Sequence, residues 1–229
     1  MIDVFRLKSI TLGDATEGPK KVRLSIVSEY MSRLIKYIYG VDSKMVQSIT
    51  VAIESTIITS MDDEEKIKEW LADAWKTKQP KLLYRASRDG WNGADFDRMC
   101  DGKGATITVV KSSDGYIFGG YTDVAWGMKN SYKNSSVSFL YILKNQAGIG
   151  PVNMPIKSNK TVHAVHHSPG YGPSFGRNPD LDIATNANRS VSSYSTIGST
   201  YELPASCADK HFLTGSSSFT ISEYEVFLV

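Results

Sequence analysis

The spacing of apolar residues divides the chain into two parts. In the first part, apolar residues recur about every four positions, as they do on one face of a helix. This pattern predicts helices over residues 20–39 and 44–59, and a third helix that begins at Met61 and ends before Pro80. The acidic residues that follow Met61 suit the start of a helix, where the helix dipole favours negative charge.

From residue 81 onward, apolar residues fall in short runs that turn residues separate, which is typical of strands. The runs predict strands over residues 106–111, 116–121, 137–143, 161–165 and 219–229. One helix is predicted over residues 92–100, with Asn92 as its cap. Short strands with few helices between them indicate antiparallel sheets packed as a sandwich, so the chain is expected to be an α+β protein.

The stretch from residue 168 to residue 199 is rich in Gly, Pro, Ser and Asn. It is too long for an ordinary connection between strands. The sequence therefore leaves two interpretations open, a functional loop or a segment that contains short strands.

Short motifs follow one another along the second part of the chain. Residues 81–90 read Lys-Leu-Leu-Tyr-Arg-Ala-Ser-Arg-Asp-Gly, and the last predicted strand ends on Glu-Val-Phe at residues 225–227. Between them lie Cys-Asp-Gly-Lys-Gly at residues 100–104 and Gly-Pro-Ser-Phe-Gly at residues 172–176. In this order, over about residues 65–229, the motifs resemble the TLDc domain family. The matching positions are Tyr84, Ser87, Gly90, Cys100, Gly104, Gly119, Gly120, Phe175, Gly176, Glu225 and Phe227.

The resemblance implies a sandwich of two antiparallel sheets flanked by helices. It divides the chain into an N-terminal helical segment, residues 1–62, and a TLDc domain, residues 63–229. It also implies a non-enzymatic adaptor or regulator that binds the vacuolar proton-pumping ATPase (V-ATPase) and supports resistance to oxidative stress. The family supplies no catalytic residue or cofactor that can be carried over to this chain. An alternative is a structural subunit of a larger assembly, held by self-association of the N-terminal helices.

Composition bears on the kind of partner and on the compartment. The chain has 26 Lys and Arg against 24 Asp and Glu, so no broad positive field attracts nucleic acid. No apolar run reaches the roughly 18 residues that a membrane span needs, and no signal-peptide pattern is present. With Cys100 and Cys207 as free thiols, a cytoplasmic protein is expected, placed at organelle membranes only through a partner.

Three histidines, His163, His166 and His167, lie close together in the sequence. In a strand, His163 and His167 would share one face and His166 would point to the other. Together with Cys100, Cys207 and His211, they are candidate zinc ligands. Surface or loop histidines are the commoner interpretation of such a group.

Two further patterns suggest sites. Asp180 and Asp182 offer oxygen ligands for calcium, but the segment lacks the Gly and the late Glu of an EF-hand loop. Residues 172–176 spell the Gly-x-Ser-x-Gly pattern of hydrolases, whose nucleophile elbow needs a strand before the Ser and a helix directly after it. Here Pro169 and Gly170 come before the pattern, and residues 177–179, Arg-Asn-Pro, follow it and cannot start a helix at once. Structural turns are the favoured interpretation of both.

Cys100 is a candidate oxidisable thiol, because Arg98 and Lys103 could favour its thiolate, although cysteines are usually small buried hydrophobic residues. No cofactor is expected, and the chain is expected to act by binding rather than by catalysis. Partner contacts are predicted in the loop regions 144–160 and 166–200, with Tyr171 and Arg177 as contact residues, because loops on a rigid scaffold usually carry function.

Overall fold

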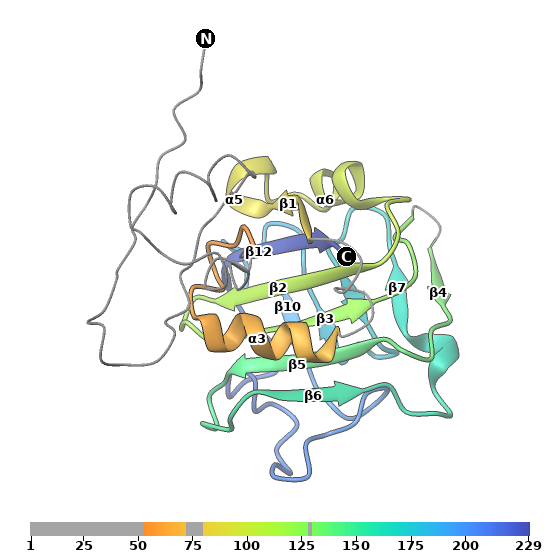
Figure 1. The fold of residues 1–229 in the computed structure, drawn as a ribbon. Coiled ribbons are helices and arrows are strands. Elements are labelled where there is room, and N and C mark those ends of the chain that lie inside the picture. The colour runs from red at the N-terminus through yellow and green to blue at the C-terminus, as the bar shows by residue number, and fades with distance from the viewer. Residues whose placement is uncertain (1–52, 72–79, 128–129) are drawn as a thin grey trace, which may run out of the picture. The chain divides into compact units, whose positions relative to one another are not determined.

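The computed structural model describes residues 53–71, 80–127 and 130–229 (Figure 1). Contacts divide the chain into two units, Met1–Glu54 and Ser55–Val229, and the fold below is that of the second unit. The predicted helix over residues 20–39 and the start of the predicted helix 44–59 lie outside the described residues. The predicted boundary at residue 63 stays a prediction.

The first of two sheets, sheet 1, has six strands in the order β1-β12-β2-β3-β5-β6, all paired antiparallel. The strands are β1 (Lys81–Arg85), β2 (Thr106–Ser112), β3 (Ile117–Thr122), β5 (Phe139–Lys144), β6 (Val152–Pro155) and β12 (Ile221–Leu228). Because β12 lies between β1 and β2, strands from opposite ends of this unit are joined in one sheet.

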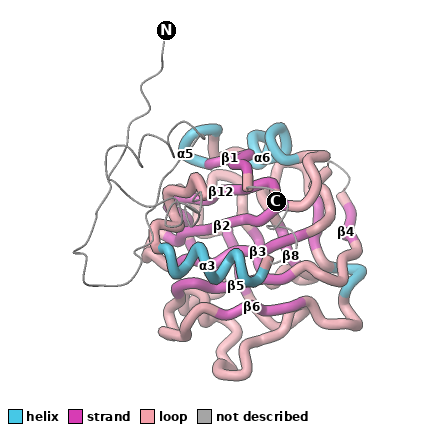
Figure 2. The backbone as a smooth tube through the Cα atoms, in the orientation of Figure 1, coloured by secondary structure: helices cyan, strands magenta, loops and turns pink. Residues whose placement is uncertain are grey.

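Sheet 2 has six short antiparallel strands in the order β11-β10-β9-β8-β7-β4. They are β4 (Ser131–Lys133), β7 (Val165–His167), β8 (Ser174–Phe175), β9 (Leu181–Asp182), β10 (Ser193–Ser195) and β11 (Ser218–Phe219). Figure 2 shows how much of the chain around these strands is loop. The Gly- and Ser-rich stretch 168–199 therefore contains short strands, one of the two interpretations that its sequence allowed.

Three α-helices and one 3-10 turn complete the described part of the chain: α3 (Met61–Trp70), α5 (Ala86–Asp89), α6 (Gly93–Cys100) and η1 (Thr161–His163). Helix α3 begins where the sequence predicted, with Ser60 as its cap and acidic residues in its first turn. Helix α6 also confirms its prediction, because Asn92 and Asp95 form a capping box there.

Two sequence predictions were wrong in part. The predicted helix 44–59 does not extend over its described residues, because Ser55 Oγ instead accepts hydrogen bonds from the backbone N of Ile57 and Ile58, at 3.0 and 2.8 Å. The predicted strand 161–165 is the 3-10 turn η1, and strand β7 begins only at Val165. Strands β1, β4 and β6 were not predicted.

The two sheets enclose the main apolar core. Side chains from both meet there, among them Phe118, Leu140, Val165, Phe175, Leu181 and Tyr224. The opposite face of sheet 1 is also apolar, and helix α3 crosses in front of it (Figure 1), with the rings of Trp70 and Tyr141 5.8 Å apart. The prediction of an α+β fold with two antiparallel sheets is confirmed.

Two adjacent glycines on β3 allow this close packing. A Cβ atom at Gly120, on the inner face, would lie 2.7 Å from Cζ of Phe175 in sheet 2. A Cβ atom at Gly119, on the outer face, would overlap the carbonyl oxygen of Thr108. The ring of Tyr141 crosses this second glycine, and its hydroxyl donates to that carbonyl oxygen at 2.9 Å. The two glycines therefore allow close contact on both faces of the strand.

Candidate functional site

A row of polar and aromatic side chains crosses sheet 2 on the face that points away from the core. Strand pairing aligns Tyr132 with His166, His166 with Ser174, Ser174 with Asp182, and Asp182 with Tyr194. Directly paired residues of antiparallel strands project to the same face. Their neighbours along the strands, including Val165, Phe175 and Leu181, belong to the core, so this polar row lies on the outer face.

A pocket of about 210 Å³, called here the sheet-2 pocket, lies over the polar row. It is lined by Tyr132, His166, Ser168, Tyr171, Ser174, Gly176, Pro179 and Asp182. Tyr132 and Tyr171 are 41% and 48% exposed, whereas Ser174 is buried. The pocket therefore combines two solvent-exposed aromatic rings with polar groups on the strands.

Asp182 is the acidic group of the pocket. Burial raises the pKa of its carboxyl, while the side chain of Ser174, through a hydrogen bond, and the charge of His166 act to lower it. The effect of burial is larger than the combined effect of Ser174 and His166, so these two neighbours offset only part of the cost of burying the charged carboxylate. A cation bound in the pocket would stabilise the charged form of this carboxyl.

The pocket brings together a serine, a histidine and an aspartate, but in the wrong order for a hydrolase. Ser174 on β8 lies between His166 on β7 and Asp182 on β9, whereas a catalytic triad needs the histidine in the middle. Two strand spacings, about 10 Å in all, separate the backbones of β7 and β9. Ser174 also lies on a strand that no helix follows directly, so the Gly-x-Ser-x-Gly pattern here is neither an elbow nor the predicted turn.

The three histidines do not converge. The rings of His163 and His166 both lie against the ring of Tyr132, with centroids 4.9 and 4.6 Å away. His167 instead points inward and stacks on Trp126, with centroids 4.8 Å apart. The predicted pairing of His163 with His167 on one face is wrong, because η1 replaces the strand there. Among the described residues, no three His, Cys, Asp or Glu side chains are grouped to hold a metal ion.

His167 is a buried structural residue. Its Nδ1 lies in hydrogen-bond contact with the backbone of Gly127, and its Nε2 has no hydrogen-bond partner. Burial lowers the pKa of His167, so its ring is neutral at neutral pH.

Asp180 anchors a loop and does not share a site with Asp182. Its buried carboxylate accepts hydrogen bonds from the backbone N of Gly198, Ser199 and Thr200, at 2.8, 2.9 and 2.9 Å. Gly176 faces the same carboxylate with φ of 86°, and a Cβ atom there would overlap it. This packing gives Gly176, the last residue of the Gly-Pro-Ser-Phe-Gly motif, a structural role.

Cys100 ends helix α6 and is fully buried. Burial raises the pKa of its thiol strongly, and the charge of Asp101 raises it further, while Lys103 lowers it by less. The thiol therefore stays protonated at neutral pH, against the expectation that Arg98 and Lys103 favour a thiolate. Cys207 is partly exposed.

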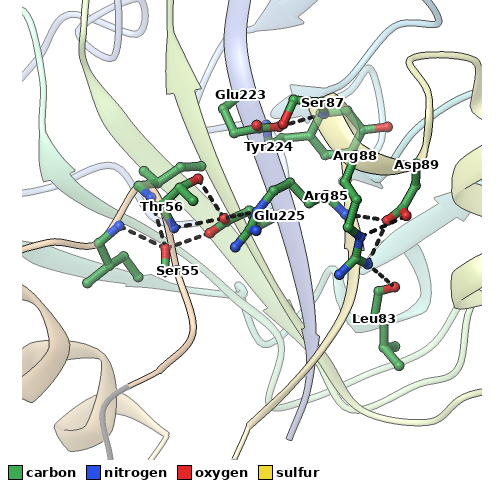
Figure 3. Close-up of polar contacts among 12 residues, drawn as sticks. Ser55, Thr56, Leu83, Arg85, Ser87, Arg88, Asp89, Glu223, Tyr224 and Glu225 are labelled. Carbon is green, nitrogen blue, oxygen red and sulfur yellow. Dashed lines mark hydrogen bonds and ion pairs between the residues drawn. The ribbon is translucent and has the colours of Figure 1, made fainter. Parts of the chain in front are cut away.

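The first and last motifs of the sequence meet at Glu225, whose side chain is fully buried on β12. Figure 3 shows its carboxylate between Ser55, Thr56 and Arg85. Arg85 Nε donates to it at 2.7 Å, Ser55 Oγ at 2.5 Å, and the backbone N and Oγ1 of Thr56 both at 2.9 Å. This network fastens the residues before α3 to the centre of sheet 1.

The remaining motif residues also have structural roles. The backbone N of Ser87 donates to Glu223 Oε1 at 3.1 Å, and Tyr84 Oη donates to the carbonyl oxygen of Gly90 at 2.5 Å. Gly90 has φ of 116°, and a Cβ atom there would overlap the carboxylate of Asp95. Phe227 is buried beside Ile107 on the outer face of sheet 1, and Gly104, with φ of 106°, leads into β2.

Comparison with known proteins fits this arrangement. The family model described as TLDc domain matches residues 52–229. The chain belongs to the TLDc domain family. Its match therefore includes Ser55 and Thr56, so the contact between this segment and Glu225 lies within the TLDc domain.

One curated relative is the MTOR-associated protein MEAK7 of Danio rerio, which is 36% identical over 53 residues. The match covers 22% of this chain and 12% of the length of that relative. The similarity is therefore local, and the activity of the whole relative does not transfer with it.

The two predicted contact residues have different places in the TLDc domain. Tyr171 lines the sheet-2 pocket, and Arg177 is exposed in the turn between β8 and β9. Sequence reasoning missed Tyr132, because the three-residue strand β4 shows no detectable periodicity. Among the described residues, no helix has the length and hydrophobicity to cross a membrane.

Proposed function

We propose that this TLDc protein is a non-enzymatic adaptor or regulator that binds a protein complex through the outer face of sheet 2. The observation that carries the proposal is the sheet-2 pocket, where two exposed tyrosine rings, Tyr132 and Tyr171, border polar groups on rigid strands. Exposed aromatic residues around a pocket are the usual anchors of protein interfaces. The V-ATPase is the first candidate partner, because the family resemblance implies it.

Support for oxidative-stress resistance would follow from this binding rather than from chemistry at a thiol. The protonated state of Cys100 favours that order of cause and effect. The proposal places the protein in the cytoplasm and brings it to organelle membranes through its partner.

Affinity capture from native lysate with the full chain, followed by mass spectrometry, tests the proposal. We expect V-ATPase subunits with the native chain, and a clear loss of them with Tyr171→Ser or Arg177→Ala. Val191→Ser is the matched control, because Val191 is 65% exposed and does not line the pocket. Capture that is equal for all variants would contradict the placement, and no specific complex at all would contradict the adaptor function.

The printed name of the Danio rerio relative gives a second candidate partner, an MTOR-containing complex. The same capture experiment distinguishes the two candidates. Recovery of MTOR-complex subunits in place of V-ATPase subunits, with the same dependence on Tyr171, would assign the adaptor function to that complex.

A further inference from the structure

We propose that the sheet-2 pocket receives a basic side chain, Lys or Arg, from the partner protein. The inference rests on the proposed function for the partner being a protein, and it adds the chemistry by which that protein is recognised. Three observations carry it: the exposed rings, the acidic side chain of Asp182 in the lining, and the size of the pocket.

The rings of Tyr132 and Tyr171 form the exposed aromatic part of the lining. A cation over the face of a tyrosine is attracted by the ring electrons, and Arg and Lys are the cations that proteins supply. The ring of Tyr132 packs against the rings of His163 and His166, with centroids 4.9 and 4.6 Å away. An ordered ring of this kind binds at a smaller entropic cost than a mobile one.

Asp182 supplies the opposite charge. It lies on β9 beside Ser174, and burial raises the pKa of its carboxyl despite the Ser174 hydrogen bond. An incoming guanidinium or ammonium group could donate hydrogen bonds to this carboxylate, and such charge-assisted bonds are stronger than neutral ones. An anionic ligand would be repelled by the same group.

The volume of the pocket favours a single side chain over a cofactor. About 210 Å³ is less than the roughly 300–1,000 Å³ of sites that enclose drug-sized ligands. The lining contains one acidic residue and one histidine, which falls short of the three or four ligands that a protein zinc site uses. An arginine or lysine side chain reaching in from an extended partner segment fits both the size and the charge.

A titration of the ¹⁵N-labelled full chain with Nα-acetyl-arginine methylamide, followed by NMR, tests the pocket directly. At about pH 8, we expect saturable shifts of amide signals in β7, β8 and β9. The matched probe Nα-acetyl-citrulline methylamide has nearly the same shape without the charge, and it should bind about ten-fold more weakly. Equal binding of the two probes, or no saturation, would overturn the proposal.

Two variants test whether the charge of Asp182 and the ring of Tyr171 contribute to binding. Asp182→Asn should weaken binding of the arginine probe about ten-fold, while Asp114→Asn, which neutralises an exposed acid in the β2–β3 turn, should leave it unchanged. Tyr171→Ser should weaken binding of the arginine probe about three-fold. Because Tyr171 is exposed in a loop, this variant should fold and can still test the proposal if Asp182→Asn does not fold. Native affinity in both pocket variants would overturn the assignment.

The failure of this inference can be told from the failure of the proposed function. If the arginine probe does not bind while the full chain still captures a complex that depends on Tyr171, the basic-side-chain pocket is wrong and the adaptor function stands. If the probe binds and Asp182→Asn loses both the probe and the captured complex, both are supported.

Discussion

At the scale of single residues, Glu225 is a fully buried acid whose carboxylate accepts hydrogen bonds from three residues. A buried carboxylate is tolerated only when hydrogen bonds and an opposite charge compensate the loss of water. Glu225 has Arg85 as its counter-charge and Ser55 and Thr56 as further donors. The residue links three parts of the sequence that are far apart.

The first prediction concerns this link. Glu225→Ala should lower the free energy of unfolding by about 3–5 kcal/mol, because it removes one member of the largely buried ion pair between Arg85 and Glu225. Urea denaturation followed by circular dichroism measures the loss. Glu69→Ala removes only the exposed ion pair with Lys66 and should change stability little, which makes it the control. Equal effects of the two substitutions would show that the network is not stabilising.

The second prediction concerns the thiols. Because Cys100 is buried and its pKa is raised, it should react with a thiol reagent such as DTNB only after unfolding, whereas Cys207 should react in the folded protein. Cys207→Ser should remove the fast reaction entirely. A fast reaction that persists in that variant would mean that Cys100 is accessible and reactive after all.

The third prediction concerns the effect of pH through His167. Its folded pKa lies below the ordinary value of about 6.5, so the unfolded chain binds this proton more tightly than the folded protein does. As pH falls through about 6.5, His167 should therefore reduce stability. His167→Asn cannot take up that proton, so the variant should lose less stability than the native protein between about pH 7.5 and pH 5.5 in urea denaturation.

The native protein and the variant differ only at residue 167, so the difference between their pH dependences reports on that side chain. Identical pH dependence of native protein and variant would contradict the role given to burial of His167.

At the scale of elements, long strands were predicted well and very short ones poorly. Strands β2, β3 and β5 were found from their apolar runs, with ends within about two residues. Strands β8 and β9 have two residues each, too few to show a period, and they exist because the neighbouring strands provide hydrogen-bond partners. Helices α3 and α6 were found because capping and charge mark their starts locally.

The candidate site was predicted as separate residues rather than as a pocket. The sequence marked two of its residues, His166 and Asp182, as candidate metal ligands, and a third, Tyr171, as a partner contact. Only the pairing of β4, β7, β8 and β9 brings them together with Tyr132. Strand pairing between segments so far apart in sequence depends on tertiary structure, which no local pattern records.

The fourth prediction concerns strand β3. Gly119→Ala should destabilise the protein by about 1–3 kcal/mol, because the added methyl group overlaps the carbonyl of Thr108 and displaces Tyr141. Gly150→Ala, where a Cβ atom would meet nothing within 4 Å, is the control and should be close to neutral. Thermal unfolding compares the two, and equal melting temperatures would show that the strand adjusts freely around the new methyl group.

At the scale of the whole molecule, the contacts separate Ser55–Val229 from the residues before it, and the TLDc match begins nearby at residue 52. The fifth prediction is that residues 52–229 alone fold with a melting temperature close to that of the full chain, as calorimetry would measure. Light scattering of both proteins tests the predicted self-association of the N-terminal segment. An oligomer of the full chain that becomes a monomer in the shortened protein would support it, while unfolding of the shortened protein would contradict the independence of the domain.

The place of β12 in the middle of sheet 1 also bears on how the protein is made. β1, β2 and β3 leave the ribosome long before β12, and until β12 arrives β1 has no partner and one edge of β2 stays open. Nascent chains aggregate through open strand edges and exposed apolar faces. Production of this TLDc domain in cells should therefore depend strongly on chaperones that hold the chain until its last strand has been synthesised.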